Sequence, residues 1–231
     1  MRIVISRRPG RSGFLVTAVA GLLCLGAAGC TGDKDEKATA ADKYLVGTQL
    51  CGGRAVSAEA SKALKAIMGS SRFGTMTEES SVAQAARDVV EAGRYSRQTG
   101  GRDDVCRIYT ADDTANFALR VTWGLESGSP TKTPASDFTV LKMGEQTLAA
   151  ANRASVRFGC RSQKFTGSPD ANHVAVGVEH WGMPTEPDGD DVKALKNAYA
   201  TVAHSFALAM AKELGCEKDG GLPARPVLDP A

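Results

Sequence analysis

The chain has 231 residues, with 28 basic and 26 acidic side chains, three histidines and six cysteines. This length suits one globular domain of ordinary size with short terminal segments. A nucleic-acid-binding surface needs clustered basic residues, and the formal net charge of +2 gives no support for one. We therefore expect no nucleic-acid partner.

The N-terminal segment has the three-part pattern of a bacterial export signal. Four arginines and no acidic residue precede an uncharged run of 17 residues from Gly13 to Gly29, which ends in small residues. This run is at the short limit for a membrane-spanning helix, so we interpret residues 1–29 as a cleaved signal peptide. A single transmembrane anchor is the alternative. The Arg7-Arg8 pair leaves the choice between the Sec and twin-arginine export routes open.

The end of this run, Leu25 to Cys30, resembles the lipobox of bacterial lipoproteins. Ala28 and Gly29 match that motif, whereas Ala27 stands where leucine is usual. The resemblance implies that Cys30 becomes the first residue and carries a diacylglyceryl group, which is enough for stable anchoring to the membrane. Polar residues 30–43 would then form a flexible tether on the extracytoplasmic face of the cell membrane. Ordinary signal-peptidase cleavage is the alternative.

Four cysteines follow Cys30, and none belongs to a CxxC pair: Cys51, Cys106, Cys160 and Cys216. An even number in an exported chain favours two disulfides over a metal or redox site. Without residues 1–29 the chain keeps 24 basic and 26 acidic residues, because the signal holds four of the 28 basic residues and none of the acidic ones. The mature domain is thus close to neutral.

Two helices are predicted after the tether. The first begins at Ser57 as its N-cap, carries apolar residues at helical spacing and stops at Gly69. The second is expected to begin at Thr77 and to end at Gly93, with an apolar stripe of Val82, Ala86, Val89 and Val90. The polar stretch that follows is interpreted as a loop.

From Val105 the hydrophobic period changes to two, which predicts strands. The clearest alternation places five apolar side chains on one face: Phe117, Leu119, Val121, Trp123 and Leu125. We expect about five strands, with a hairpin at residues 111–114 between the first two. Their ranges are 105–110, 116–127, 138–142, 154–162 and 173–181.

A long amphipathic helix begins near Asp190 or Asp191 and ends at Gly215. We therefore predict one α+β domain over residues 44–216, an antiparallel sheet of about five strands packed against two N-terminal helices and one long C-terminal helix. Residues 217–231, with three prolines, are interpreted as a disordered tail.

Among the three possible disulfide connectivities we favour Cys51–Cys106 and Cys160–Cys216, because each pair would then join a helix end to the sheet. A crossed pairing, in which the first and last helix ends converge, stays open.

This arrangement resembles an actinobacterial lipoprotein family known as domain of unknown function 3558. The resemblance covers residues 45–216. It rests on a lipobox followed by a cysteine ahead of a helix (QLCGGRAVSAEASKAL), a cysteine strand (VCRIYT), an alternating strand and a late cysteine strand (RFGCRS). Where members usually carry a CxW-like strand, this chain has Cys106-Arg107-Ile108. The resemblance implies a two-disulfide α+β fold and assigns no activity.

No catalytic motif is evident. The chain lacks GxSxG, and Ser129-Pro-Thr-Lys132 has SxxK spacing without the SDN and KTG partners. His173 and His180 are seven residues apart on one strand, so they should point to opposite faces and not share a metal. His204 falls outside the apolar stripe of its helix, which predicts a solvated or boundary position. The acidic stretch 186–191 lacks EF-hand spacing and is interpreted as a solvated loop that caps the last helix.

We predict no catalytic residue, no metal site and no cofactor. The leading hypothesis is a non-enzymatic, membrane-tethered domain that binds an unknown protein, a cell-wall component or a small-molecule ligand. Trp181, at the rim of the last strand, is the candidate partner contact, with packing on the final helix as the alternative. The competing hypothesis is a cell-envelope hydrolase whose residues come from separated strands. One small domain offers no second lobe for a transporter's solute-binding protein.

Overall fold

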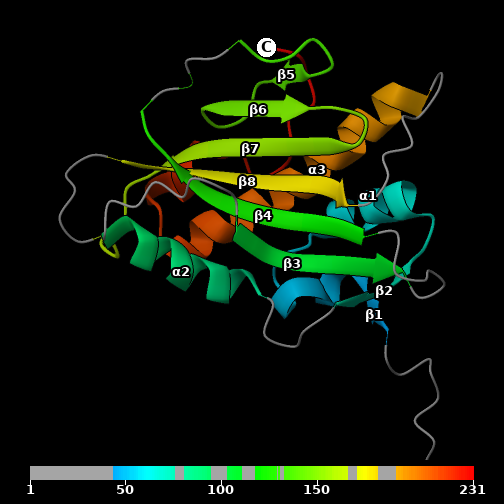
Figure 1. Ribbon diagram of the computed structural model, residues 1–231, viewed down its shortest axis with the longest axis horizontal. Coiled ribbons are helices and arrows are strands. Elements are labelled where there is room, and N and C mark those ends of the chain that lie inside the picture. Colours follow the sequence, from blue (N-terminus) through cyan, green and yellow to red (C-terminus); the bar gives the residue numbers. More distant parts are fainter. Residues whose placement is uncertain are drawn as a thin grey trace, which may run out of the picture. The chain divides into compact units, whose positions relative to one another are not determined.

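The computed structural model describes residues 44–75, 81–94, 103–110, 118–128, 130, 133–165, 171–181 and 191–231. These residues form two layers, a large antiparallel sheet and a group of helices (Figure 1). The proposed lipid site Cys30, the expected hairpin at 111–114 and most of the acidic stretch 186–191 lie outside the described residues.

The described residues contain eight strands, all antiparallel, in the order β1-β2-β3-β4-β8-β7-β6-β5. The chain builds one half of the sheet from β1 to β4, continues at the opposite edge with β5, and returns until β8 pairs with β4. The strand ranges are β1 (Leu45–Val46), β2 (Arg72–Thr75), β3 (Asp103–Thr110), β4 (Ala118–Glu126), β5 (Thr139–Leu141), β6 (Gln146–Ala149), β7 (Arg153–Cys160) and β8 (Asn172–Trp181).

The prediction of about five strands is wrong, because β1, β2 and β6 were not expected. These strands have two to four residues each, which is too short for an alternating pattern to be distinguished from a loop. The five expected strands correspond to β3, β4, β5, β7 and β8.

In the described part of the chain three α-helices lie on one side of the sheet: α1 (Ala58–Met68), α2 (Val82–Arg94) and α3 (Val192–Leu214). The helices α2 and α3 pack on the strands, and α1 packs on α3. Two short 3₁₀ helices, Gly47–Gly52 and Glu217–Gly221, were not expected.

The predicted caps of α1 are confirmed, since the Ser57 hydroxyl accepts a hydrogen bond from the Ala60 amide at 3.1 Å and Gly69 is left-handed with φ 70°. The bounds predicted for the second helix are wrong at both ends, since α2 begins at Val82, five residues after Thr77, and continues through Gly93 to Arg94. The Ser81 hydroxyl accepts a hydrogen bond from the Gln84 amide at 3.2 Å and caps the helix.

The core lies between the sheet and the helices. On β4 the side chains of Leu119, Val121, Trp123 and Leu125 are buried on the helix side, as the alternation predicts. Cross-strand neighbours continue this layer, since Val121 lies opposite Val178 and Trp123 opposite Val176. From α3, Phe206, Met210 and Leu214 are buried against it. The opposite face of the sheet carries the alternate residues. We call it the open face because the described helices pack on the other side, although Thr122 and Ala175 are buried on it.

Two disulfides join the layers. Cys51, in the first 3₁₀ helix, is bonded to Cys106 on β3, and Cys160 at the end of β7 is bonded to Cys216 just after α3. The sequential pairing is thereby confirmed. With sequence separations of 55 and 56, each closes a loop worth about 4 kcal/mol in the chain-entropy account.

The C-terminal segment packs against the domain, in contrast to the disordered tail expected from its composition. Leu222 is buried, and the Ala231 amide donates a hydrogen bond to the Val140 carbonyl on β5 at 2.9 Å. Figure 1 shows the C-terminus beside β5, at the edge of the sheet. The segment is ordered because it pairs with an open strand edge, a tertiary contact that composition does not reveal.

Candidate ligand-binding groove

Two adjoining hollows lie between α2 and the C-terminal part of α3, with volumes of about 570 and 670 Å³. They share Ala83 and Glu213, and we treat them together as the α2–α3 groove. Its apolar wall consists of Ala83, Ala86, Val90 and Ala209, and its charged residues are Arg54, Arg87, Arg94, Lys164, Lys212, Glu91 and Glu213.

The helical period explains the α2 side of the groove. Ala83, Val90 and Arg94 are separated by seven and four residues, so they lie along one side of the helix, with Ala86 and Arg87 between them. Ala85 and Val89 are buried and face the core instead. Because alanine side chains are small, this side of α2 leaves space in front of α3.

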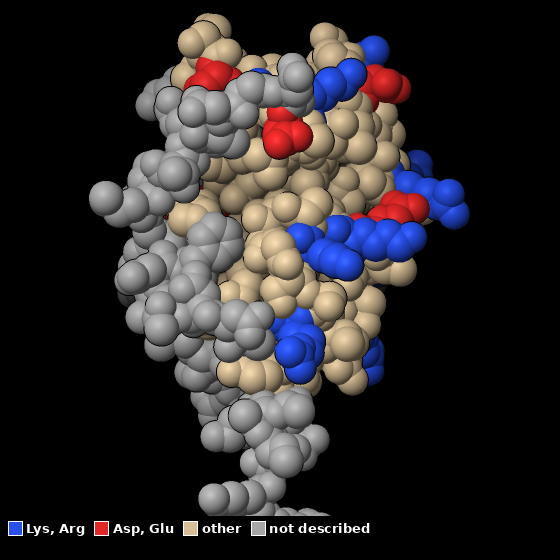
Figure 2. Space-filling model, turned by 90° about the vertical axis from the view of Figure 1, so that its right-hand side faces the viewer, with Lys and Arg blue, Asp and Glu red and all other residues tan. Residues whose placement is uncertain are grey.

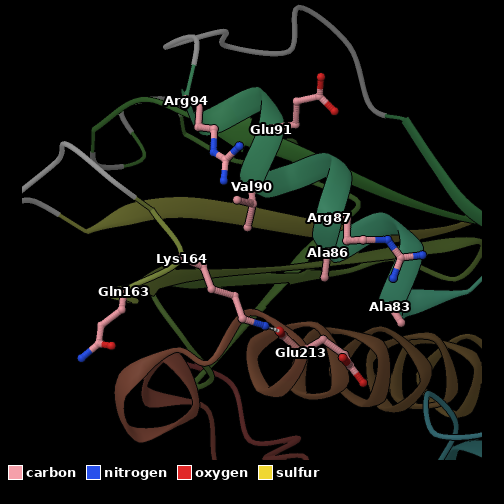
Figure 3. A pocket seen from close by; sticks show the side chains of 9 residues that line it. All are labelled: Ala83, Ala86, Arg87, Val90, Glu91, Arg94, Gln163, Lys164 and Glu213. Atoms are coloured by element: carbon pink, nitrogen blue, oxygen red, sulfur yellow. Dashed lines mark hydrogen bonds between the residues drawn. The ribbon is translucent and has the colours of Figure 1, made fainter. Parts of the chain in front are cut away.

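Figure 3 shows how the charged groups are arranged around this space. Val90 and the guanidinium of Arg94 point from α2 across the groove, whereas Glu91 and Gln163 point away from it. Lys164 lies on the opposite wall, where its ammonium donates a hydrogen bond to the backbone carbonyl of Glu213. This bond satisfies one of the carbonyls that the last turn of α3 leaves without a helical partner.

The groove has a local excess of positive charge. It is lined by five basic residues and two acidic ones, although residues 30–231 contain 24 basic and 26 acidic residues. In the part of the chain that the structure describes, none of the five basic residues forms an ion pair with a carboxylate. A concave surface lined by cations of this kind attracts anions.

The walls of the groove are held close together. The Ser162 hydroxyl donates a hydrogen bond to the Leu214 carbonyl at 2.5 Å, and the Cys160–Cys216 disulfide joins the same two segments. On α2, a Cβ atom added at Gly93 would lie 2.9 Å from Cδ1 of Phe165, so any larger residue would displace the Phe165 ring. These contacts fix Lys164 and the end of α3 relative to α2.

A second polar cluster lies on the open face. His173 Nδ1 is 2.9 and 2.8 Å from the two carboxylate oxygens of Glu145. Arg157 forms ion pairs with Glu126 at 2.6 Å and with Glu145 at 3.3 Å. In the described residues no hydrogen bond joins His173 to a hydroxyl or thiol, so the cluster has a base but no nucleophile in reach. It therefore pairs charges across neighbouring strands.

The other two histidines are on the helix side. His180 lies opposite Leu119, and its position confirms that His173 and His180 face opposite sides of the sheet. The solvated or boundary position expected for His204 is wrong, since His204 is 2% exposed and its Nε2–H donates to the Pro223 carbonyl at 2.9 Å. Burial lowers the pKa of both His180 and His204. The described residues contain no cluster of three or more potential metal ligands.

The predicted site residues are not brought together. The disulfides occupy all four cysteines of the domain, and Trp181 ends β8 opposite Ala118, remote in register from the His173 cluster. Its role as a partner contact stays a prediction.

The sequence prediction did not include Arg87 and Arg94. Their spacing of seven residues, with Val90 between them, was the available signal. Lys164 gave no such signal, because only the fold brings it to the same hollow as the α2 residues.

The surface shown in Figure 2 has basic side chains in separate groups, with carboxylates beside some of them and uncharged surface between them. This face therefore gives no argument for a nucleic-acid partner. Among the described helices, none is long and apolar enough to cross a membrane.

No family model matches the chain, and no curated protein or solved structure matches it. The resemblance noted from the cysteine motifs therefore stays a prediction.

Proposed function

We propose that this chain is a lipid-anchored extracytoplasmic lipoprotein whose domain binds a small-molecule ligand in the α2–α3 groove without transforming it. The observation that carries this proposal is the pair of adjoining hollows of about 570 and 670 Å³. Their size is in the range of small-molecule sites, and their lining combines an apolar strip on α2 with several charged side chains.

Lipid anchoring is supported by the sequence. Cys30 follows a run that ends in small residues, and the four later cysteines pair with one another, which leaves Cys30 for lipid. The 14 residues from Cys30 to Lys43 would span roughly 20 Å as a flexible chain. The domain would thus stay close to the outer surface of the membrane.

A binding role is favoured over catalysis by the chemistry of the groove. Arginine and lysine side chains can hold and orient a ligand, but they supply no nucleophile activated by a base. The hydrolase alternative rests on the His173–Glu145 pair, which lies on the open face of the sheet and not in the groove.

The anchor is tested by replacing Cys30→Ser in the full chain. We expect lipid labelling to be lost and the protein to be released to the medium or left unprocessed. The control is Cys24→Ser, which should keep both the label and the membrane location because Cys24 follows large leucines. Unchanged membrane retention and labelling of the Cys30 variant would refute the anchor.

The binding site is tested by filling the groove. Ala83 lines both hollows, so Ala83→Trp should exclude a ligand that the wild-type lipoprotein retains when it is purified from membranes and analysed by native mass spectrometry. Ala66→Trp is the matched control, because Ala66 is exposed on α1. The proposal fails if the wild type carries no small molecule, or if the Ala83 variant retains it equally.

A further inference from the structure

We infer that the ligand of the α2–α3 groove is an anionic amphiphile, with an acidic head group held by Arg94 opposite Lys164 and an apolar body along Ala83, Ala86 and Val90. This inference rests on the proposed function and adds the chemical class of the ligand.

The head group is assigned from the charges that face the space. The Arg94 guanidinium points across the groove, and the carboxylate of Glu91 on the same helix points away (Figure 3). In the described residues Arg94 has no ion-pair partner. A planar guanidinium can bind a carboxylate, sulfate or phosphate through two parallel hydrogen bonds. A cationic head group would instead be repelled by the basic lining.

The apolar body is assigned from the wall of α2. Ala83, Ala86 and Val90 present only hydrocarbon to the groove, and Arg94 follows Val90 by one helical turn. From Ala83 to Arg94 the helix rises by roughly 16 Å. Along α2 the groove thus has an apolar strip that ends at Arg94, with Arg87 also lining this wall. A strip beside cations matches a head and a chain better than an ion alone.

Lys164 contributes to selectivity for an anionic ligand more than to direct contact with it. Its ammonium is already bound to the Glu213 carbonyl, so it contributes positive charge from the opposite wall while remaining in place. Arg94 is exposed at the end of α2, so the hydrogen bonds of its guanidinium are available to a ligand.

The test uses the full lipoprotein in nanodiscs, titrated by calorimetry with decanoate. Discs that carry the Ala83→Trp variant serve as the blank, so that partition of the probe into lipid is subtracted. We expect saturable binding of decanoate. Decanol should bind at least about tenfold more weakly, a difference in binding free energy of roughly 1.4 kcal/mol. Decyltrimethylammonium, inorganic phosphate and polyglutamate should give no saturable heat.

The decisive variants change the charge at Arg94. Arg94→Glu should weaken decanoate binding by about tenfold or more, and Arg94→Gln should give a smaller loss. Lys62→Glu, an equal charge change on the exposed side of α1, should leave the affinity unchanged and exclude a general effect of net charge.

The inference is overturned if decanol binds as tightly as decanoate, if phosphate or polyglutamate alone binds, or if both Arg94 variants keep wild-type affinity. If these results occur while Ala83→Trp still removes the retained molecule, only the ligand class is wrong. If Ala83→Trp has no effect in either experiment, the groove itself is not the site.

Discussion

The open face of the sheet and the α2–α3 groove are both rich in charged residues, but they use charge in opposite ways. On the open face Arg120 lies opposite Glu179 in the register of β4 and β8, and it also pairs with Asp104 on β3. The hydrogen bond that the Arg120 guanidinium donates to the Asp104 carboxylate is the main reason that the pKa of Arg120 is raised. In the groove, the five basic residues have no carboxylate partner among the described residues.

The difference follows from how the two surfaces are built. Neighbouring strands place side chains directly opposite one another, so opposite charges on a sheet meet within the fold. The groove is lined by separate elements, namely α2, α3, the segment after β7 and the segment around Arg54, whose charged residues face a gap. A charged side chain that already forms an ion pair within the fold has fewer hydrogen bonds and less net charge available to a ligand. Unpaired charged side chains are therefore the better guide to binding.

The largest expected effect is the loss of stability on removal of the Cys160–Cys216 disulfide, which should affect the groove and leave the open face intact. Replacing Cys160→Ala together with Cys216→Ala should lower the free energy of unfolding by about 4 kcal/mol, measured by chemical denaturation. Ligand retention should also fall, because Cys160 and Cys216 border the segments that carry Lys164 and Glu213. The ion pairs of the open face join strands of one sheet and should persist.

Removing the other pair, Cys51→Ala with Cys106→Ala, is the comparison for stability. The Cys51–Cys106 disulfide closes a loop of nearly the same length as Cys160–Cys216, with a sequence separation of 55 against 56. A loss of less than about 1 kcal/mol in both double variants would contradict the chain-entropy argument.

A smaller effect is expected from one arginine in each region. The Arg157 side chain is 8% exposed and lies between Glu126 and Glu145, so Arg157→Met would leave two carboxylates without a counter-charge. We expect a loss of about 2 kcal/mol, less than for a fully buried pair, because both glutamates are partly exposed. Arg94→Met should change stability by at most about 0.5 kcal/mol, because Arg94 is an exposed residue.

If Arg157→Met and Arg94→Met lowered the free energy of unfolding equally in the same denaturation assay, the distinction between paired and available charge would not hold. If Arg157→Met weakened ligand retention as much as Arg94→Met does, the groove would have been placed on the wrong face of the molecule.

The sequence predicted the long, periodic elements and missed the short ones. Ser57 and Gly69 delimit α1 as expected, and α3 ends at Gly215, because caps and helical periods act within a few residues. β6 has four residues and exists because it pairs with β7. Pairing of that kind is set by the whole sheet and leaves no local pattern.

The groove was beyond sequence reasoning for a related reason. Arg94 and Lys164 are 70 positions apart, and only the packing of α2 beside α3 brings them to one cavity. The disulfides were predictable because few cysteines leave few pairings. Charged residues are numerous, and their partners follow from the fold.

The smallest expected effect concerns His204, which is buried on the helix side next to the Pro223 carbonyl. Burial lowers its pKa from the ordinary value of 6.5, although the Pro223 carbonyl and Glu59 act in the opposite direction. The unfolded chain therefore takes up a proton more readily than the folded one, and the free energy of unfolding should fall as the pH decreases below about 6.5. His204→Gln should flatten this slope between about pH 7 and pH 5.5. His180, whose pKa burial also lowers, should supply part of the slope that remains. Urea denaturation at a series of pH values measures the slope, and an unchanged slope in His204→Gln would mean that His204 is protonated as easily in the folded domain as in the unfolded chain.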